Sequence, residues 1–269
     1  MSNAGIAFIA SLAAGLSTGV GSIIGFFTKR TNTKFLSVAL GFSAGVMIFV
    51  SMVELYPQSV YDMSTHFGEK AAGWATLGAF LGGMLLVALI DRMLPSDQNP
   101  HEVKTPEHFH PSPVPKSSHH HLMKTGVFTA LAIAIHNFPE GLASFASTLE
   151  NPQVGLVIAA AIAIHNIPEG MAVSLPVYYA TGSRKKAFWM SFLSGMVEPL
   201  GAVVGYLIFG TWLTSWVLGA VMAAVAGIMV YISLDELLPA AREYGEHHLS
   251  IYGLIGGMVL MGSSLLLLK

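Results

Sequence analysis

The chain has 269 residues, of which 53% are hydrophobic and only 10% are charged. Soluble globular proteins are about one quarter charged, so this composition indicates a membrane protein. The net charge of −2 gives no reason to expect nucleic-acid binding, and the lack of cysteine excludes disulfides and thiolate metal sites. The N-terminus lacks the basic region and cleavage site of a signal peptide, so the first apolar segment is expected to remain as a spanning helix.

The apolar residues form segments long enough to cross a bilayer as helices, which takes about 20 residues each. The pattern predicts an all-α integral membrane protein with one transmembrane domain over residues 1–269. The eight expected spans lie at roughly 4–27, 35–57, 71–94, 125–147, 153–179, 187–209, 213–239 and 250–268. Glycines four apart within them, as at Gly15 and Gly19 or Gly201 and Gly205, favour close packing of helix backbones.

Residues 95–124 interrupt this series. They include six prolines and six histidines with few apolar residues, and therefore predict a flexible loop that cannot bury a core. A His-rich tract can hold metal loosely, so a plain solvated loop and a weak metal-collecting role both remain open.

Basic residues predict the orientation of the spans, because they concentrate in cytoplasmic loops. Eleven of the thirteen lie in the connections after spans one, three, five and seven, if Arg92 is counted with the third connection. The opposite side has only Lys70 and Lys269. Both termini are therefore expected outside, and the loop at 95–124 in the cytoplasm.

A ten-residue motif occurs twice with nine identical positions, as AIAIHNFPEG at 132–141 and AIAIHNIPEG at 161–170. In each copy a His and a Glu stand four apart and share one helix face. The proline before each Glu frees a backbone carbonyl and loosens the helix there. Two imidazoles and two carboxylates form a plausible binding site for a divalent transition metal. These four residues are His136, Glu140, His165 and Glu169.

Carboxylates at the bilayer centre are costly, by about 2.5–3.5 kcal/mol each on insertion scales, and are a functional hypothesis by default. Glu140, Glu169 and Glu198 lie well inside expected spans with no Lys or Arg in mid-helix to neutralise them. We interpret Glu198, which precedes a proline, as a ligand from a third helix. Asn137 and Asn166 could ligate through their amide oxygens or hydrogen-bond between helices. Glu54, Asp235 and Glu236 are either entrance and exit groups or solvated interfacial groups.

A second repeat relates 44–57 to 226–239, with seven of fourteen positions identical. These segments lie in the expected spans two and seven, which run in opposite directions, as do spans four and five. Both repeats therefore suggest an inverted 3+2+3 architecture. Inverted repeats are common in transporters and place the substrate site near the midplane at the repeat interface.

The two His-Asn-x-Pro-Glu-Gly segments resemble the signature of the ZIP (Zrt/Irt-like) divalent metal transporters, in particular the bacterial zinc-uptake permease branch. The resemblance extends over essentially the whole chain, including the His-containing loop and the Glu-Pro of span six. It implies import of divalent metal, zinc first and then iron, manganese, cobalt or cadmium, across a bacterial inner membrane, with a homodimer as the frequent assembly.

The resemblance also implies a binuclear centre between spans four and five. Its first position would use His136, Glu140, His165 and Glu169. The second would use Asn137, Asn166 and Glu198, with Glu140 and Glu169 bridging. The metal is cargo rather than a cofactor, and no enzyme activity is expected. The neutral amide of Asn166, where some relatives have Asp, makes the second position less anionic.

Two other classes use similar residues. A membrane metallohydrolase could employ two His and one Glu with an open water position, but the His-Glu-x-x-His string of zincins does not occur. Carboxylate-bridged di-metal redox proteins use Glu-x-x-His spacing, whereas the order here is His-x-x-x-Glu. Transport is the reading that also explains the inverted repeats.

Overall fold

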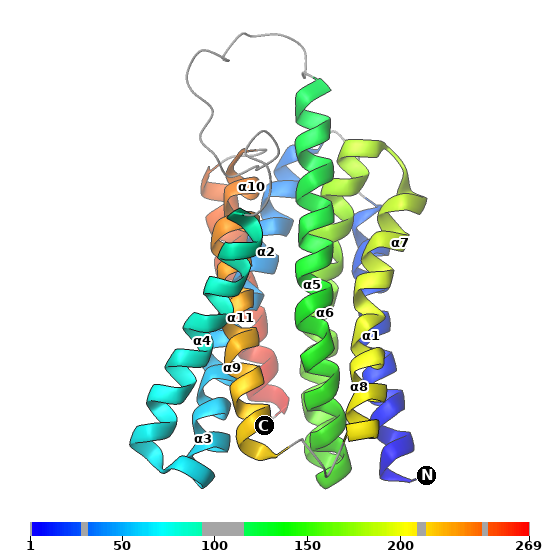
Figure 1. The fold of residues 1–269 in the computed structure, drawn as a ribbon. Helices are drawn as coiled ribbons and strands as arrows, with labels where there is room; N and C mark the ends of the chain where they lie inside the picture. The colour runs from blue at the N-terminus through cyan, green and yellow to red at the C-terminus, as the bar shows by residue number, and fades with distance from the viewer. Residues whose placement is uncertain (1, 28–31, 93–115, 209–213, 244–246, 269) are drawn as a thin grey trace.

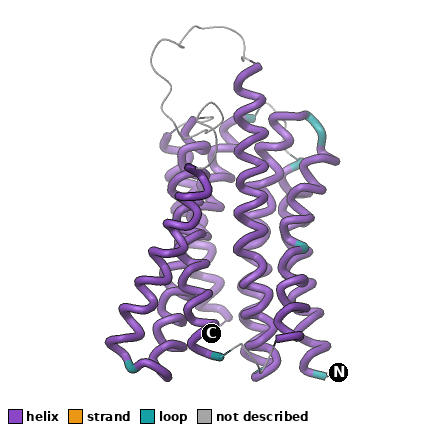
Figure 2. Tube along the Cα trace, in the orientation of Figure 1, coloured by secondary structure: helices purple, strands orange, loops and turns teal. Residues whose placement is uncertain are grey.

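The computed structural model describes residues 2–27, 32–92, 116–208, 214–243 and 247–268. All regular elements in these ranges are helical (Figure 2). Seven helical stretches among the described residues are long and apolar enough to cross a membrane. These seven do not include α5, which is 35 residues long and corresponds to the expected fourth span. The predicted class, an all-α protein with multiple spans, is confirmed.

The helices form an elongated bundle in which α5 and α6 stand at the centre (Figure 1). On one side of them lie α1, α7 and α8, and on the other lie α2, α3, α4, α9, α10 and α11. Both ends of the described chain lie at the same end of the bundle (Figure 1). The helix bounds are α1 Asn3–Gly25, α2 Thr33–Val50, α3 Tyr56–Phe67, α4 Glu69–Arg92, α5 Lys116–Glu150, α6 Pro152–Thr181, α7 Arg184–Gly195, α8 Val197–Ile208, α9 Ser215–Ile232, α10 Leu238–Glu243 and α11 His247–Leu268.

The second span is longer than the expected 35–57, because the helix continues past Pro57 to Phe67. Pro57 has no N–H to donate, and the chain accommodates it through a wide turn at Ser51–Leu55. In this turn the Tyr56 N–H donates to the Ser51 carbonyl, one residue further back than in an α-helix. The Ser51 hydroxyl also donates to the Met47 carbonyl at 2.7 Å.

The seventh span repeats this feature at the matching place. A wide turn at Ser233–Leu237 precedes Pro239, and there the Leu238 N–H donates to the Ser233 carbonyl. The Ser233 hydroxyl donates to the Met229 carbonyl, also at 2.7 Å. The second repeat in the sequence therefore encodes the same local backbone geometry twice.

Two other boundaries differ from expectation. Helix α5 begins at Lys116 rather than near 125, so the last nine residues of the expected loop are helical. The last proline of that segment is Pro115, after which nothing prevents the helical hydrogen-bond ladder from forming. The remaining residues of the expected loop up to 115 lie outside the described residues. The sixth span is divided at Met196, since Pro199 cannot donate to the Gly195 carbonyl.

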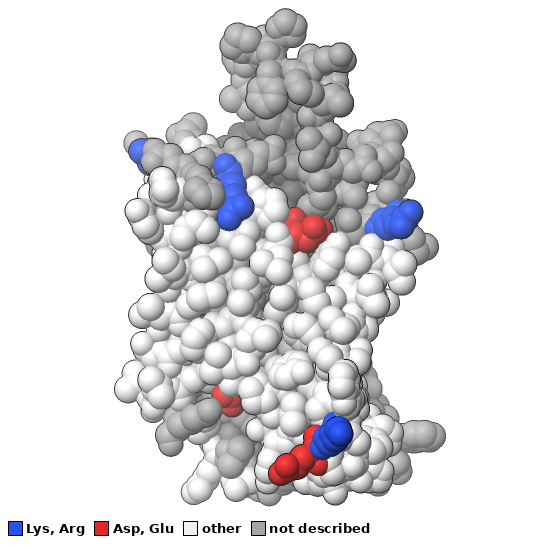
Figure 3. Space-filling model, turned by 90° about the vertical axis from the view of Figure 1, so that its left-hand side faces the viewer, with Lys and Arg blue, Asp and Glu red and all other residues white. Residues whose placement is uncertain are grey.

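The outer helices carry large exposed apolar side chains, including Trp74 and Leu89 on α4 and Val259 and Leu266 on α11. Such a wide apolar surface is typical of a membrane-embedded protein. One face of the molecule has a broad uncharged surface, with the charged groups visible on it towards its two ends (Figure 3).

Close helix packing at glycines is confirmed. A Cβ at Gly21 in α1 would meet the Ile167 carbonyl oxygen in α6, and a Cβ at Gly201 in α8 would meet the Phe138 carbonyl oxygen in α5. In the same way α2 packs on α11, where a Cβ at Gly45 would meet the Leu254 carbonyl oxygen. Such contacts are possible only without a side chain, and those at Gly21 and Gly201 bring α1 and α8 against the motif-bearing helices.

Candidate metal-binding site

The two copies of the ten-residue motif face each other across the α5–α6 contact in the middle of the bundle. Pro139 and Pro168 each lie inside a helix, one residue before Glu140 and Glu169. The Pro168 carbonyl accepts a hydrogen bond from the Ser43 hydroxyl of α2 at 2.6 Å. Serine in an apolar span is a weak signal, and sequence reasoning did not single out Ser43.

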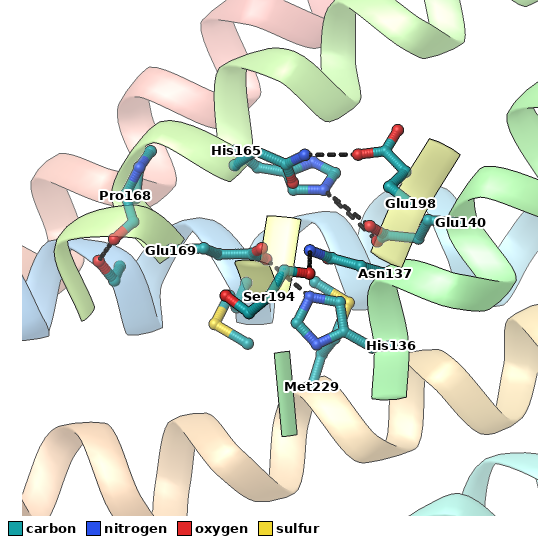
Figure 4. Close-up of polar contacts among 12 residues, drawn as sticks. His136, Asn137, Glu140, His165, Pro168, Glu169, Ser194, Glu198 and Met229 are labelled. Atoms are coloured by element: carbon teal, nitrogen blue, oxygen red, sulfur yellow. Dashed lines mark hydrogen bonds and ion pairs between the residues drawn. The ribbon is translucent and has the colours of Figure 1, made fainter. Parts of the chain in front are cut away.

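The histidines and glutamates pair across the two helices rather than along them. Nε2 of His136 on α5 lies 3.1 Å from Oε1 of Glu169 on α6. Nε2 of His165 on α6 lies 3.4 Å from Oε1 of Glu140 on α5. Figure 4 shows these two crossed pairs side by side. The structure therefore brings together the four residues that sequence analysis singled out as the core of the site.

The two asparagines are held by backbone carbonyls of neighbouring helices. The Asn137 amide N–H donates to the Ser194 carbonyl of α7 at 3.1 Å, and the Asn166 amide N–H donates to the Ala14 carbonyl of α1 at 3.0 Å. These contacts settle which end of each amide is the nitrogen, because only the NH₂ group can donate to a carbonyl. The amide oxygen of each Asn has no hydrogen-bond partner among the described residues.

Glu198 reaches the same cluster from α8. Its Oε2 accepts a second hydrogen bond from the Asn166 amide at 2.8 Å. Its other carboxylate oxygen, Oε1, is buried and has no partner among the described side chains and backbone. The seven residues predicted for the site thus come from three helices and lie in one cluster.

All seven side chains are buried, with at most 2% of any of them exposed. Residues 125–183, which include both motifs, contain no Lys or Arg. A buried polar group without a partner costs free energy, and a buried carboxylate without a counter-charge costs more. The unpartnered oxygens of Glu169, Glu198 and the two asparagines therefore favour binding of a cation.

The cluster is not a ready-made coordination sphere. Among the residues that the structure describes, no three His, Asp or Glu side chains are arranged so that they could hold one metal ion. The His and Glu of each pair instead contact each other. For one cation to contact more than two of these groups, side chains of the two pairs would have to move closer together.

A separate buried polar contact lies on α5 towards the end of the bundle where α10 lies. Thr129 lies seven residues before His136 and therefore on the same face of the helix. Its buried hydroxyl donates to Oε2 of Glu236 at 3.1 Å. Sequence reasoning left the role of Glu236 open and missed Thr129, because a single threonine in an apolar span gives no signal.

Comparison with known proteins identifies the family. The family model described as ZIP zinc transporter matches residues 95–264. A zinc transporter ZupT of Lysinibacillus sphaericus is 58% identical over 98% of this chain and 97% of its own length. Proteins of the same name from Streptococcus mutans and Oceanobacillus iheyensis are 57% and 59% identical, over 97% and 100% of this chain and 97% and 100% of their own lengths.

The chain belongs to the ZIP zinc transporter family. The resemblance inferred from the duplicated motif is confirmed, and the match extends over nearly the whole length of the chain. ZIP membership makes the protein a transporter rather than an enzyme, so the metallohydrolase alternative is not favoured.

Proposed function

We propose that this ZIP family member carries zinc across the membrane through the cluster between α5 and α6. The observation that supports this most directly is the crossed pairing of His136 with Glu169 and of His165 with Glu140 inside an apolar bundle. Residues 125–183, which contain both motifs, have no lysine or arginine that could neutralise the carboxylates. A divalent cation would do so, and it would replace the imidazole as the partner of each carboxylate.

The proposed site holds two ions. The first is bound by the two imidazoles and two carboxylates of the crossed pairs. The second is bound by both amide oxygens and Glu198, and Glu140 and Glu169 bridge the two ions. In support of this, each amide NH₂ group is anchored on a carbonyl, so each amide oxygen is available as a ligand. The complete proposed ligand set is His136, Asn137, Glu140, His165, Asn166, Glu169 and Glu198.

The ligand chemistry suits borderline and hard divalent ions. Imidazole and carboxylate favour Zn²⁺, with Fe²⁺, Mn²⁺, Co²⁺ and Cd²⁺ as further cargo, and disfavour soft Cu⁺, which prefers sulfur. Conduction also requires binding weak enough for the ion to leave. A site of mixed nitrogen and oxygen ligands without thiolate meets this condition.

We further propose the inverted 3+2+3 arrangement for the helices. In its support, the pairing of α2 with α11 has its counterpart in the pairing of α9 with α4, where a Cβ at Gly227 would meet the Phe80 carbonyl oxygen. The pairing of α1 with α6 likewise has its counterpart in that of α8 with α5. The matching wide turns before Pro57 and Pro239 agree with the same relation.

The direction of transport is proposed as import into the cytoplasm of a bacterial cell, across the inner membrane, with both termini outside. The excess of basic residues in four connections supports this orientation. The apolar outer faces of α4 and α11 offer surface for lipid and for the second subunit of a homodimer.

The direct test is uptake of radioactive zinc by proteoliposomes that contain the purified protein. Saturable uptake by the wild type and its loss in Glu169→Ala are the expected results. Glu69→Ala is the matched control, because Glu69 is exposed at the start of α4 and far along the chain from the cluster. Normal uptake by Glu169→Ala would mean that the duplicated motif is structural.

A further inference from the structure

Residues of α1 and residues 180 positions later, in α7 and α8, make equivalent contacts with the two motif copies. The Asn166 amide is anchored on the Ala14 carbonyl and the Asn137 amide on the Ser194 carbonyl. The residues that follow, Gly15 and Gly195, face each other: a Cβ on either would lie 2.7 or 2.6 Å from the carbonyl oxygen of the other.

The same separation relates Thr18 to Glu198. A Cβ at Gly141, which ends the first motif, would meet the Glu198 carbonyl oxygen. A Cβ at Gly170, which ends the second motif, would meet the Thr18 carbonyl oxygen. Because Gly141 and Gly170 are equivalent positions of the repeat, Thr18 on α1 is the counterpart of Glu198 on α8.

The Thr18 side chain is fully buried and points towards α7. Its Cβ and Oγ1 both lie 2.6 Å from where a Cβ of Gly195 would stand, so this glycine leaves the room that the side chain fills. Oγ1 of Thr18 has no hydrogen-bond partner among the described residues, and neither does Oδ1 of Asn137. By the correspondence of the two motifs, the neutral side chains of Asn137 and Thr18 are therefore the counterparts of Asn166 and of the carboxylate of Glu198.

We propose that the neutral Thr18 limits the charge of the proposed binuclear site to three carboxylates and thereby sets the affinity for the second ion. Two divalent ions bring four positive charges, and Glu140, Glu169 and Glu198 compensate three of them. The second ion is consequently bound less tightly than it would be with a carboxylate at position 18, and it can leave. This inference rests on the proposed transport of two bound ions.

The test compares Thr18→Asp with the wild type by zinc titration of purified protein and by uptake into proteoliposomes. We expect the dissociation constant of the weaker zinc to fall about tenfold in Thr18→Asp, because a fourth carboxylate attracts both ions. The maximal uptake rate should fall together with KM. A merely structural role for Thr18 would not tighten binding. An unchanged dissociation constant in Thr18→Asp would overturn the proposal.

Two further variants cover the case in which aspartate is not accepted at the buried position. Thr18→Val has nearly the same shape and should retain two zinc ions per chain, since Thr18 is not one of the proposed ligands. Loss of one zinc in Thr18→Val would overturn the proposal by making Thr18 a ligand. The double variant Thr18→Asp with Glu198→Thr, which moves the carboxylate from position 198 to position 18, should also bind two zinc ions.

Different results would contradict the proposed binuclear site and the proposed role of Thr18. A wild-type chain that binds one zinc ion, or Glu198→Gln that still binds two, would contradict the binuclear site whatever the Thr18 variants do.

Discussion

Nε2 of His136 and Oε1 of Glu169 lie 3.1 Å apart although the two residues are 33 positions apart in the chain. Each motif copy therefore completes its polar contacts with the other copy and not within itself. Neither helix could keep its carboxylate buried alone, because the partner that offsets the desolvation cost comes from the other helix. The pairing joins the polar groups of α5 and α6 in one buried cluster.

Removal of both members of this pair should cost less than the sum of the single changes. His136→Gln and Glu169→Gln should each weaken zinc binding about tenfold or more, since each removes a ligand of the same ion. In the double variant the loss in binding free energy should be smaller than the two losses added together. Zinc titration of the four proteins measures this coupling, and strict additivity would indicate that the residues do not share an ion.

Glu198→Gln should reduce the zinc content from two ions to one per chain, because the second position loses its only carboxylate that is not shared. The crossed pairs remain intact in this variant, so binding of the first ion should persist. Metal analysis of protein after dialysis gives the stoichiometry. Retention of two ions would place the second site elsewhere.

Zinc binding should weaken as the pH falls from neutral to acidic values. Protons compete with metal for His and Glu ligands, so the occupied site is favoured at higher pH. Titration in detergent, where no proton gradient exists, isolates this competition from any coupling of transport to protons. Zinc affinity that stays constant between neutral and acidic pH would contradict ligation by these groups.

Gly45→Ala should destabilise the bundle by about 1–3 kcal/mol, since the added Cβ would run into the Leu254 carbonyl oxygen of α11 and the backbones must separate. Thermal unfolding in detergent should record a lower midpoint. Gly78→Ala is the matched control, because a Cβ at Gly78 in α4 meets nothing within 4 Å. Equal midpoints for the two variants would show that the close approach of α2 and α11 carries no stability.

Local features of the fold followed from the sequence where a single residue type decides the outcome. The apolar segments predicted the spanning helices, and glycine spacing predicted where backbones approach. The sequence suggested that the second and seventh spans end at Pro57 and Pro239. The helices continue instead, because a wide turn before each proline accommodates the missing N–H. Whether a helix bends, breaks or widens at a proline depends on the surrounding packing.

The sequence alone determined the membrane class and the candidate ligands, since both follow from residue type and from the four-residue spacing of His and Glu on a helix face. The tertiary structure decided which ligands meet. It paired each His with the Glu of the other motif and anchored the two asparagine amides on Ala14 and Ser194. It also made Thr18 the counterpart of Glu198, since each lies against the glycine that ends one motif. These relations depend on how helices far apart in the chain pack. Helical periodicity describes one helix at a time and carries no information about the rotation or register of its neighbours.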